Sequence, residues 1–352
     1  MGFFANALKS DRIKRALYAS GGLEAWHRRR NRERLTVITF HRVLPRDDPR
    51  WATSDPEYTL PLDLFTACLP FFRQHYDVVS LHDVLDGRQL PERPLLITFD
   101  DGWSDTEEYA LPALREHDLP AVVFVVSDAV DRRVPFWQEQ LIAGWRAGRL
   151  DAHACTRTWD DVRGELPPPA FAAAGRDDLD PIRELITALE HADVSVRARV
   201  LDELATRLDD GARHMITGEQ VRRLADAGVA IGAHGQTHAP LTRVSNVDAE
   251  LVTARRALED HLGGTQVAAM SCPHGSWDER VLAGARAAGY RRVFTSVPEL
   301  SAPDAEVLGR VGFTAETISG GDGRFAPERL ALHLFRKPHA RSSRSAAAVS
   351  MG

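Results

Sequence analysis

Short, continuous apolar runs alternate with amphipathic segments through most of the chain. Apolar runs bounded by turn residues predict buried strands, and they occur at 95–99, 121–126 and 267–272. Segments with apolar residues at helical spacing lie between these runs, for example at 62–72 and 247–262. Strands that alternate with helices in this way favour a parallel sheet, so the pattern predicts an α/β fold.

The alternation is interrupted between residues 131 and 215. This interval contains helical segments, the run Pro167-Pro168-Pro169 and no strand pattern. We expect a helical insertion, which either forms a lid beside a functional site or packs on the side of the main domain without touching substrate. The predicted organisation is an extension over 1–34, a main domain over 35–315 and a C-terminal extension over 316–352. The tail from Arg341 is rich in Ser, Arg and Ala, which predicts disorder there.

The N-terminal extension is basic and has apolar residues among its charges. A basic amphipathic helix either contacts an anionic membrane surface or packs on the main domain with its arginines exposed, and we favour the second interpretation. The apolar stretch Phe3–Leu8 is too short for a signal core, and no window reaches the length of a membrane span. We therefore expect a cytoplasmic protein, with membrane association as the alternative.

Composition narrows the class of protein. The chain has 352 residues, of which 43% are hydrophobic and 27% are charged, as in soluble globular proteins with a well-buried core. Its formal net charge of −6 gives no general attraction to nucleic acid, so no nucleic-acid partner is predicted. The three cysteines are scattered and form neither a disulfide framework nor a zinc-binding spacing. The sequence carries no signal for an oligomeric state.

Two adjacent carboxylates follow the apolar run at 95–99. Asp100 and Asp101 stand where this strand ends, and Gly102 allows the chain to turn sharply. Successive side chains of an extended backbone point to opposite sides, so the two carboxylates can have two different roles. The carboxyl ends of strands are where α/β proteins build their sites. The alternative is an ordinary Asp-Asp-Gly turn.

Two histidines follow a second short apolar segment. His234 and His238 are four residues apart, a spacing that places both imidazoles on one side of a helical turn and suits a shared metal ion. The alternative is a pair of surface or capping histidines. An acidic motif and a paired-histidine motif at two strand ends favour a metal site over coincidence.

These two motifs carry a resemblance to a known family. Thr98–Gly102 and His234–His238 resemble the first two motifs of the polysaccharide deacetylases, which are the NodB-homology enzymes of carbohydrate esterase family 4. Ser271–Asp278 resembles the third motif in altered form. The resemblance implies a distorted (β/α) barrel, here with a helical insertion. It also implies one divalent metal ion, usually zinc, and hydrolysis of N-acetyl or O-acetyl groups on sugars.

The resemblance also implies roles for individual residues. Asp101, His234 and His238 would be the metal ligands, and Asp100 would be the base that accepts a proton from the attacking water. The general acid has three candidates, which are His333 in Leu330–His333, His41 after Phe40, and His274. The family's third-motif arginine has no counterpart before Cys272, and Arg310 could take its place beside the catalytic carboxylate.

The predicted function is metal-dependent deacetylation of a polysaccharide, an oligosaccharide or a glycolipid precursor. One alternative is hydrolysis of small cyclic amides or ureides on the same scaffold. A second alternative is a carbohydrate-binding protein without catalytic activity. The sequence does not specify the sugar, its linkage or which divalent metal is bound.

Overall fold

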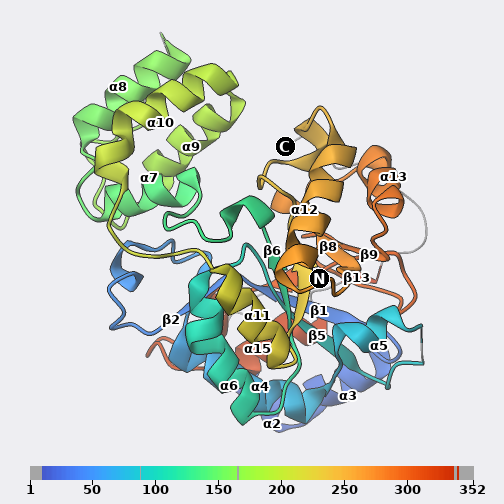
Figure 1. Cartoon of the computed structure of the whole chain (residues 1–352). Helices are drawn as coiled ribbons and strands as arrows, with labels where there is room; N and C mark the ends of the chain where they lie inside the picture. The colour runs from blue at the N-terminus through green and yellow to red at the C-terminus, as the bar shows by residue number, and fades with distance from the viewer. Residues whose placement is uncertain (1–9, 88, 165, 337–338, 341–352) are drawn as a thin grey trace.

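One parallel β-sheet forms the centre of the protein (Figure 1). The computed structural model describes residues 10–87, 89–164, 166–336 and 339–340. In sheet order the strands are β11 (Val307–Leu308), β9 (Arg292–Phe294), β8 (Ala269–Ser271), β7 (Ala230–Ala233), β6 (Val122–Val125), β5 (Pro94–Phe99), β1 (Thr36–Phe40) and β12 (Val311–Gly312), with β4 (Asp77–Val78) pairing at the start of β5.

The two edge strands of this sheet are neighbours in sequence. β11 ends at Leu308 and β12 begins at Val311, so only Gly309 and Arg310 separate the two ends of the strand order. The sheet therefore curls until its edges approach each other, which makes it a distorted barrel with a break at Arg310. The (β/α) barrel that the sequence predicts is confirmed.

A glycine forms the corner at this break. A Cβ atom at Gly309 would lie 2.4 Å from Glu299 Cγ and 2.6 Å from the carbonyl oxygen of Val297, so no other residue fits. The apolar pattern predicts a single strand over Leu308–Phe313. The structure instead has separate strands on either side of the corner, because the tight approach at Gly309 interrupts the extended chain.

The strands are buried on both faces. Ile38 of β1 and Ile97 of β5 lie in the apolar cluster shared with the surrounding helices, whereas the alternate residues Val37 and Leu96 belong to a second cluster. Burial on both faces explains why these strands are continuously apolar in sequence. The helices around the barrel are α4 (Leu62–His75), α5 (Leu81–Leu85), α6 (Leu111–Glu116), α11 (Gly218–Asp226), α12 (Val247–His261), α13 (Glu279–Ala287) and α15 (Pro327–Arg336).

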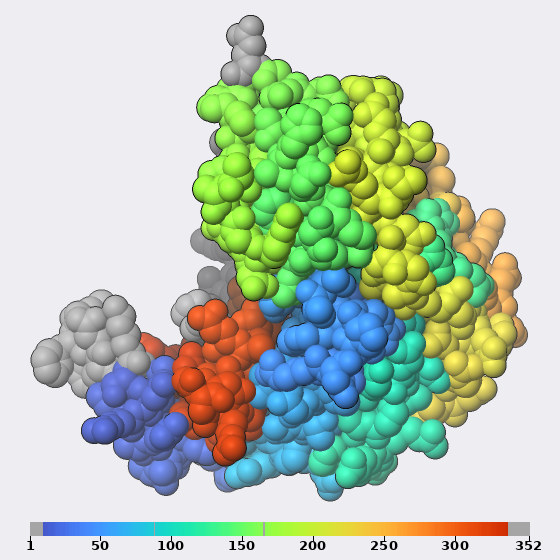
Figure 2. All heavy atoms as spheres, turned by 90° about the vertical axis from the view of Figure 1, so that its left-hand side faces the viewer, coloured from blue at the N-terminus to red at the C-terminus, as the bar shows by residue number. Residues whose placement is uncertain are grey.

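Four helices between β6 and β7 form a separate lobe (Figures 1 and 2). They are α7 (Trp137–Arg146), α8 (Ala152–Arg163), α9 (Asp180–His191) and α10 (Val194–Leu208). Leu141, Trp145, Ile182 and Leu204 of this lobe lie in an apolar cluster of its own. The lobe thus has a small core that does not depend on the core of the barrel.

The N-terminal helices pack on the barrel side of the molecule. α2 (Asp11–Ala19) and α3 (Gly22–Arg30) contact α15, and the buried His27 ring stacks on Phe335 with 4.1 Å between ring centroids. His27 Nε2 also donates to the carbonyl oxygen of His75 on α4, so these two helices pack on the main domain as well as on α15, although Ile13, Leu17 and Trp26 remain exposed. Membrane contact through this face stays a prediction. Among the described residues, no helix combines the length and apolar character needed to cross a bilayer.

Short elements connect these parts of the fold. The tail from Arg341, for which we expect disorder, lies outside the described residues. The connecting elements are β2 (Arg42–Leu44), β3 (Thr59–Pro61), β10 (Glu299–Leu300), β13 (His339–Ala340), α14 (Ala315–Ile318), the π-helical turn η2 (Thr106–Ala110), and the 3₁₀ turns η1 (Trp51–Thr53), η3 (Ser127–Ala129), η4 (Leu241–Arg243) and η5 (Pro273–Gly275).

Candidate metal centre

The predicted site residues follow strands that lie close together in the sheet. β5 and β7 flank β6, and all three run parallel, so the segments after Phe99 and Ala233 emerge at the same edge. Asp101 has a left-handed backbone with φ of 76°, as does Gly102 with φ of 80°. This sharp turn points the Asp101 carboxylate back over the strand ends, at a conformational cost that a non-glycine residue rarely bears.

Asp101, His234 and His238 come together at this edge. Asp101 Oδ1 lies 3.4 Å from His234 Nε2 and 3.2 Å from His238 Nε2, and the three donor atoms are all within 4.8 Å of one another. Asp101 and His234 are buried. The three residues that the two motifs predict as a set therefore meet around one point, at distances that allow a single ion to contact all of them.

Hydrogen bonds fix the orientation of two of these side chains. His234 Nδ1 donates to the carbonyl oxygen of Ser271 at 2.9 Å, which leaves the Nε2 lone pair directed at Asp101. Trp103 Nε1 donates to the other carboxylate oxygen of Asp101, Oδ2, at 2.9 Å. In both Asp101 and His234, one side-chain atom that could bind a metal is thus hydrogen-bonded within the protein. The other one, Oδ1 of Asp101 or Nε2 of His234, faces the shared point.

The electrostatics of this cluster favour a cation. Burial raises the pKa of Asp101, but hydrogen bonds with His234 and His238 outweigh burial and hold this pKa well below its ordinary value. Burial lowers the pKa of His234, but the carboxylates of Asp100 and Asp101 outweigh burial and raise it. The two buried carboxylates therefore attract positive charge to this point. A metal cation bound by one carboxylate and two neutral imidazoles would supply that charge.

The segment from His234 to His238 is a loop, so the helical turn expected from the four-residue spacing is wrong. Gly235 and His238 both have left-handed backbones, with φ of 72° and 66°. Glu250 Oε1 on α12 accepts hydrogen bonds from the amides of Gln236 (3.0 Å) and Thr237 (2.8 Å), which holds the loop in shape. A helical turn is unnecessary because this buried carboxylate satisfies the loop amides.

Asp100 forms a hydrogen-bonded ion pair with Arg310, and not with His234 or His238. Arg310 Nη1 donates to Asp100 Oδ1 at 2.7 Å and Nη2 donates to Oδ2 at 2.6 Å, and both side chains are buried. Burial raises the pKa of Asp100, but the charge of Arg310, followed by that of His234, outweighs burial and keeps this pKa below its ordinary value. The arginine predicted from its strand-end position therefore reaches the carboxylate from the break in the barrel.

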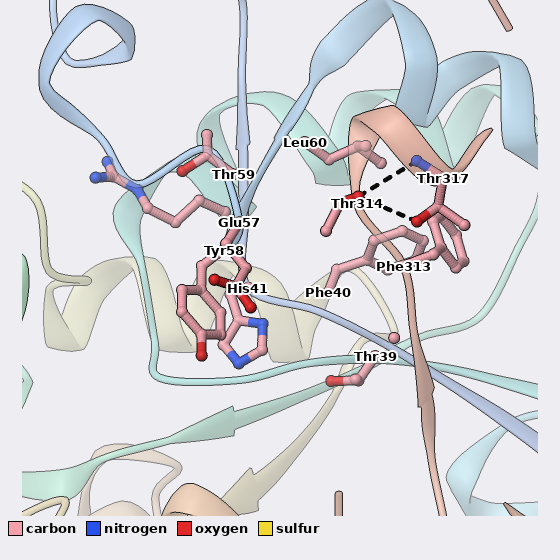
Figure 3. A pocket seen from close by; sticks show the side chains of 12 residues that line it. Thr39, Phe40, His41, Glu57, Tyr58, Thr59, Leu60, Phe313, Thr314 and Thr317 are labelled. Atoms are coloured by element: carbon pink, nitrogen blue, oxygen red, sulfur yellow. Dashed lines mark hydrogen bonds between the residues drawn. The ribbon is translucent and has the colours of Figure 1, made fainter. Parts of the chain in front are cut away.

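His41 lies beside the same site. Burial lowers its pKa, and the charges of Asp101 and Asp100 oppose this without overcoming it. Its ring packs edge-on against Tyr58, with 5.0 Å between centroids. Figure 3 shows these two rings together at one side of a cavity of 290 Å³, whose other side is formed by Phe313, Thr314 and Thr317.

The other two histidine candidates have different surroundings. His274 Nε2 donates to the carbonyl oxygen of His238 at 3.2 Å, and burial lowers its pKa to about 4. His333 lies on α15, where its Nε2 donates to the carbonyl oxygen of Gly312 at 2.9 Å. The structure thus brings His41 and His274 to the edge of the candidate centre, whereas the ring nitrogen Nε2 of His333 is engaged by β12.

A second buried ion pair supports Trp103 and was not foreseen from the sequence. Arg42 Nε and the backbone amide of Val43 donate to the carboxylate of Asp105, each at 2.9 Å. The Arg42 guanidinium lies over the Trp103 ring, 4.3 Å from its centroid. In the sequence, Asp105 lies just after the first motif and Arg42 follows His41, and neither position predicts the pairing.

Comparison with known proteins identifies what this arrangement is similar to. The family model described as polysaccharide deacetylase matches residues 87–293. No curated protein sequence gives a significant match.

Solved structures share the fold at low sequence identity. They include the deacetylase PplD from Streptococcus pyogenes in complex with acetate, with 15% identity, a TM-score of 0.54, and coverage of 86% of this chain and 98% of that chain. IcaB from Ammonifex degensii has 18% identity and a TM-score of 0.52, with coverage of 86% and 97%. A de-N-acetylase from Aggregatibacter actinomycetemcomitans has 17% identity and a TM-score of 0.51, with coverage of 82% and 98%.

Proposed function

The chain belongs to the polysaccharide deacetylase family, and on that premise we propose that it removes N-acetyl groups from a carbohydrate with the help of a divalent metal ion. The observation that carries this proposal is the meeting of Asp101, His234 and His238 beside the buried pair of Asp100 and Arg310. An amide is a poor electrophile, so its hydrolysis needs both an activated water and a stabilised transition state. The site contains groups suited to each task.

The three clustered side chains would hold the metal ion. Two imidazoles and one carboxylate are a ligand set typical of catalytic zinc, although the same donors suit several other divalent metals. When bound, such an ion polarises the acetyl carbonyl and lowers the pKa of a coordinated water towards about 7. The tasks of Trp103 and Ser271 are to orient Asp101 and His234 for this role.

Asp100 would accept the proton of the attacking water. Arg310 keeps it ionised and holds it in one orientation through two charge-assisted hydrogen bonds. Asp100 Oδ2 lies 3.9 Å from His234 Nε2 of the cluster. Asp100 is thus held beside the cluster without being one of its three ligands. This position fits a division of roles in which Asp101 binds the metal and Asp100 acts as the base.

The cavity beside His41 supports a sugar as the substrate. Its volume of 290 Å³ is near the lower end of the range for small-molecule pockets. Tyr58 is 45% exposed, so it offers an aromatic face on which a sugar ring could pack.

An acetate-release assay tests the proposal. Purified protein with one equivalent of zinc is expected to release acetate from at least one member of a panel of N-acetylated glycans, and the Asp100→Asn variant to lose about 100-fold or more in kcat while retaining its metal. Ring opening of a cyclic ureide without acetate release would favour the alternative amidohydrolase. Glycan binding without turnover would favour the carbohydrate-binding protein.

A further inference from the structure

Both connections between the helical lobe and the barrel run past the candidate metal centre. The connection that leaves the lobe is bonded to the turn after β5, where the Ser104 amide donates to the carbonyl oxygen of His214 at 2.8 Å. In the same connection, the Ile216 amide donates to the carbonyl oxygen of Gly102 at 2.9 Å. The connection that enters the lobe is bonded to this one, because the His214 amide donates to the carbonyl oxygen of Arg133 at 2.9 Å. The lobe is thus joined to the barrel at the edge of the sheet that carries the three candidate ligands.

The connection into the lobe ends in an aromatic ring that lies on one of these ligands. Phe136, the residue before α7, stacks on His238 with 4.2 Å between centroids and 30° between ring planes. Its ring also packs edge-on against Trp103, with 5.9 Å between centroids. Phe136 is only 9% exposed and belongs to a small apolar cluster with Trp103, Val126 and Met215. These apolar surroundings fix the Phe136 ring while it lies against the imidazole.

His238 needs such support more than His234 does. A histidine ring has only a weak torsional preference about its outer bond, so a contact must set its orientation. His234 is set by the hydrogen bond from its Nδ1 to the carbonyl oxygen of Ser271, whereas Nδ1 of His238 forms no hydrogen bond within the described part of the chain. The ring of His274 lies 4.7 Å from that of His238, but His274 is exposed and so leaves its neighbour room to turn. Phe136 is therefore the buried contact that limits rotation of the His238 ring.

Ion pairs away from the metal centre hold the lobe on the barrel. Arg183 on α9 donates to both carboxylate oxygens of Asp55, at 2.8 and 3.0 Å, and its Nη1 lies 2.7 Å from Glu57 Oε2. Arg146 at the end of α7 donates to the carbonyl oxygen of Ser54. Figure 2 shows the lobe seated on the segment that contains these loop residues. The contacts that dock the lobe therefore also hold the start of α7 in place.

We propose that Phe136 is a positioning residue for the metal ligand His238, and that docking of the lobe is thereby coupled to metal binding. The inference rests on the metal site of the proposed function. An imidazole that is already held in its binding orientation loses less conformational freedom when the ion binds, so the affinity is higher. Because such coupling is reciprocal, a bound ion should stabilise the docked lobe by the same factor by which docking raises the metal affinity.

Zinc affinity separates positioning from a purely structural role. Competition with a zinc chelator gives the affinities of wild type, Phe136→Leu and Phe171→Leu. Leucine keeps much of the apolar volume but has no flat face to lie on the imidazole. Phe171→Leu is the matched control, because Phe171 is a buried phenylalanine of the lobe that packs edge-on against Trp145 at 6.1 Å and belongs to the lobe's own core. Melting temperature and the visible absorption spectrum of the cobalt-loaded protein are recorded for each variant.

We expect Phe136→Leu to bind zinc about 10-fold more weakly, the lower end of what loss of an outer partner of a ligand costs, and Phe171→Leu to bind it as wild type does. The cobalt spectrum should change in Phe136→Leu alone, because it reports the geometry of the ligands. Phe136→Tyr, which keeps an aromatic face, should restore both properties. The inference is overturned if Phe136→Leu binds zinc with wild-type affinity, or if both leucine variants lose affinity equally.

A second pair of variants tests the coupling at a distance from the ligands. Arg183→Gln removes the ion pairs between the lobe and the barrel, whereas Arg199→Gln removes pairs with Asp161 and Glu203 that lie within the lobe. Zinc affinity should fall in Arg183→Gln and stay unchanged in Arg199→Gln. Equal affinities in these two variants would overturn the coupling. Failure of the proposed function is distinguishable, since it appears in the wild type, either as absent zinc binding or as zinc binding without acetate release.

Discussion

Arg310 binds both carboxylate oxygens of Asp100, with hydrogen bonds of 2.7 and 2.6 Å, from the point where the two edges of the barrel approach each other. Gly309 and Arg310 are the only residues between β11 and β12. The break in the barrel therefore lets an arginine enter from the sheet edge and hold the Asp100 carboxylate in one orientation. The same feature explains why the sheet is distorted at this place.

Replacing this arginine by lysine should impair catalysis more than metal binding. Arg310→Lys keeps a positive charge but loses the paired donors that orient Asp100, so we expect kcat to fall by about 100-fold. Arg310→Met removes the charge altogether and should cost about 3–5 kcal/mol in the free energy of unfolding, because Asp100 is left buried and unpaired. Steady-state kinetics, urea unfolding and zinc content measure the three effects. Wild-type kcat in the lysine variant would show that the pair is structural only.

Removing the hydrogen bond from Trp103 to Asp101 should weaken metal binding. Trp103→Phe leaves Asp101 Oδ2 without its donor, and loss of such an outer partner typically costs roughly 10- to 100-fold in metal affinity. Trp159→Phe is the matched control, since Trp159 also donates its indole N–H, to the carbonyl oxygen of Leu166 in the helical lobe. Competition with a zinc chelator gives the affinities. Equal affinities in the two variants would argue against orientation of the ligand by Trp103.

The buried His27 should make the protein less stable in mild acid. Burial lowers the pKa of His27 from 6.5 to about 4 in the folded chain. A depressed pKa means that the unfolded chain binds the proton more readily, so the contribution to stability is complete above pH 6.5 and is lost as pH falls towards 4. Between pH 7 and pH 5 the loss is about 2 kcal/mol.

Urea unfolding of wild type and His27→Gln at these two pH values checks this expectation. The variant should be less stable at pH 7 and should lose less stability on acidification. His75 also has a lowered pKa, chiefly through burial, so part of the acid sensitivity remains in the variant. An identical pH dependence in both proteins would mean that His27 is not the responsible group.

The sequence predicted the fold and the meeting of three side chains because both depend on local patterns. Continuous apolar runs identify buried strands. Asp101 and His234 lie within two residues of the ends of two strands, and His238 lies in the loop that follows the second one. Parallel strands bring their carboxyl ends to one edge, so residues that are far apart in sequence can be expected to meet there. Arg310 was also found by its place at a strand end.

The remaining features depend on contacts between distant segments. The spacing of His234 and His238 suits a helical turn as well as a loop, and what selects the loop is Glu250 on α12. The docking of the helical lobe, through the contact of Phe136 with His238 and the ion pair of Arg183 with Asp55, likewise joins residues that are far apart in sequence.

The central claim is that one metal ion is bound by Asp101, His234 and His238, and calorimetric titration of metal-free protein with zinc tests it most directly. Wild type and His274→Ala should each bind one equivalent with the same affinity, although the His274 ring lies only 4.7 Å from that of His238. His238→Ala loses a ligand itself. Its zinc affinity should therefore fall by at least the roughly 10- to 100-fold that is typical when a residue hydrogen-bonded to a ligand is lost. Zinc binding by His238→Ala with wild-type stoichiometry and affinity would contradict the account.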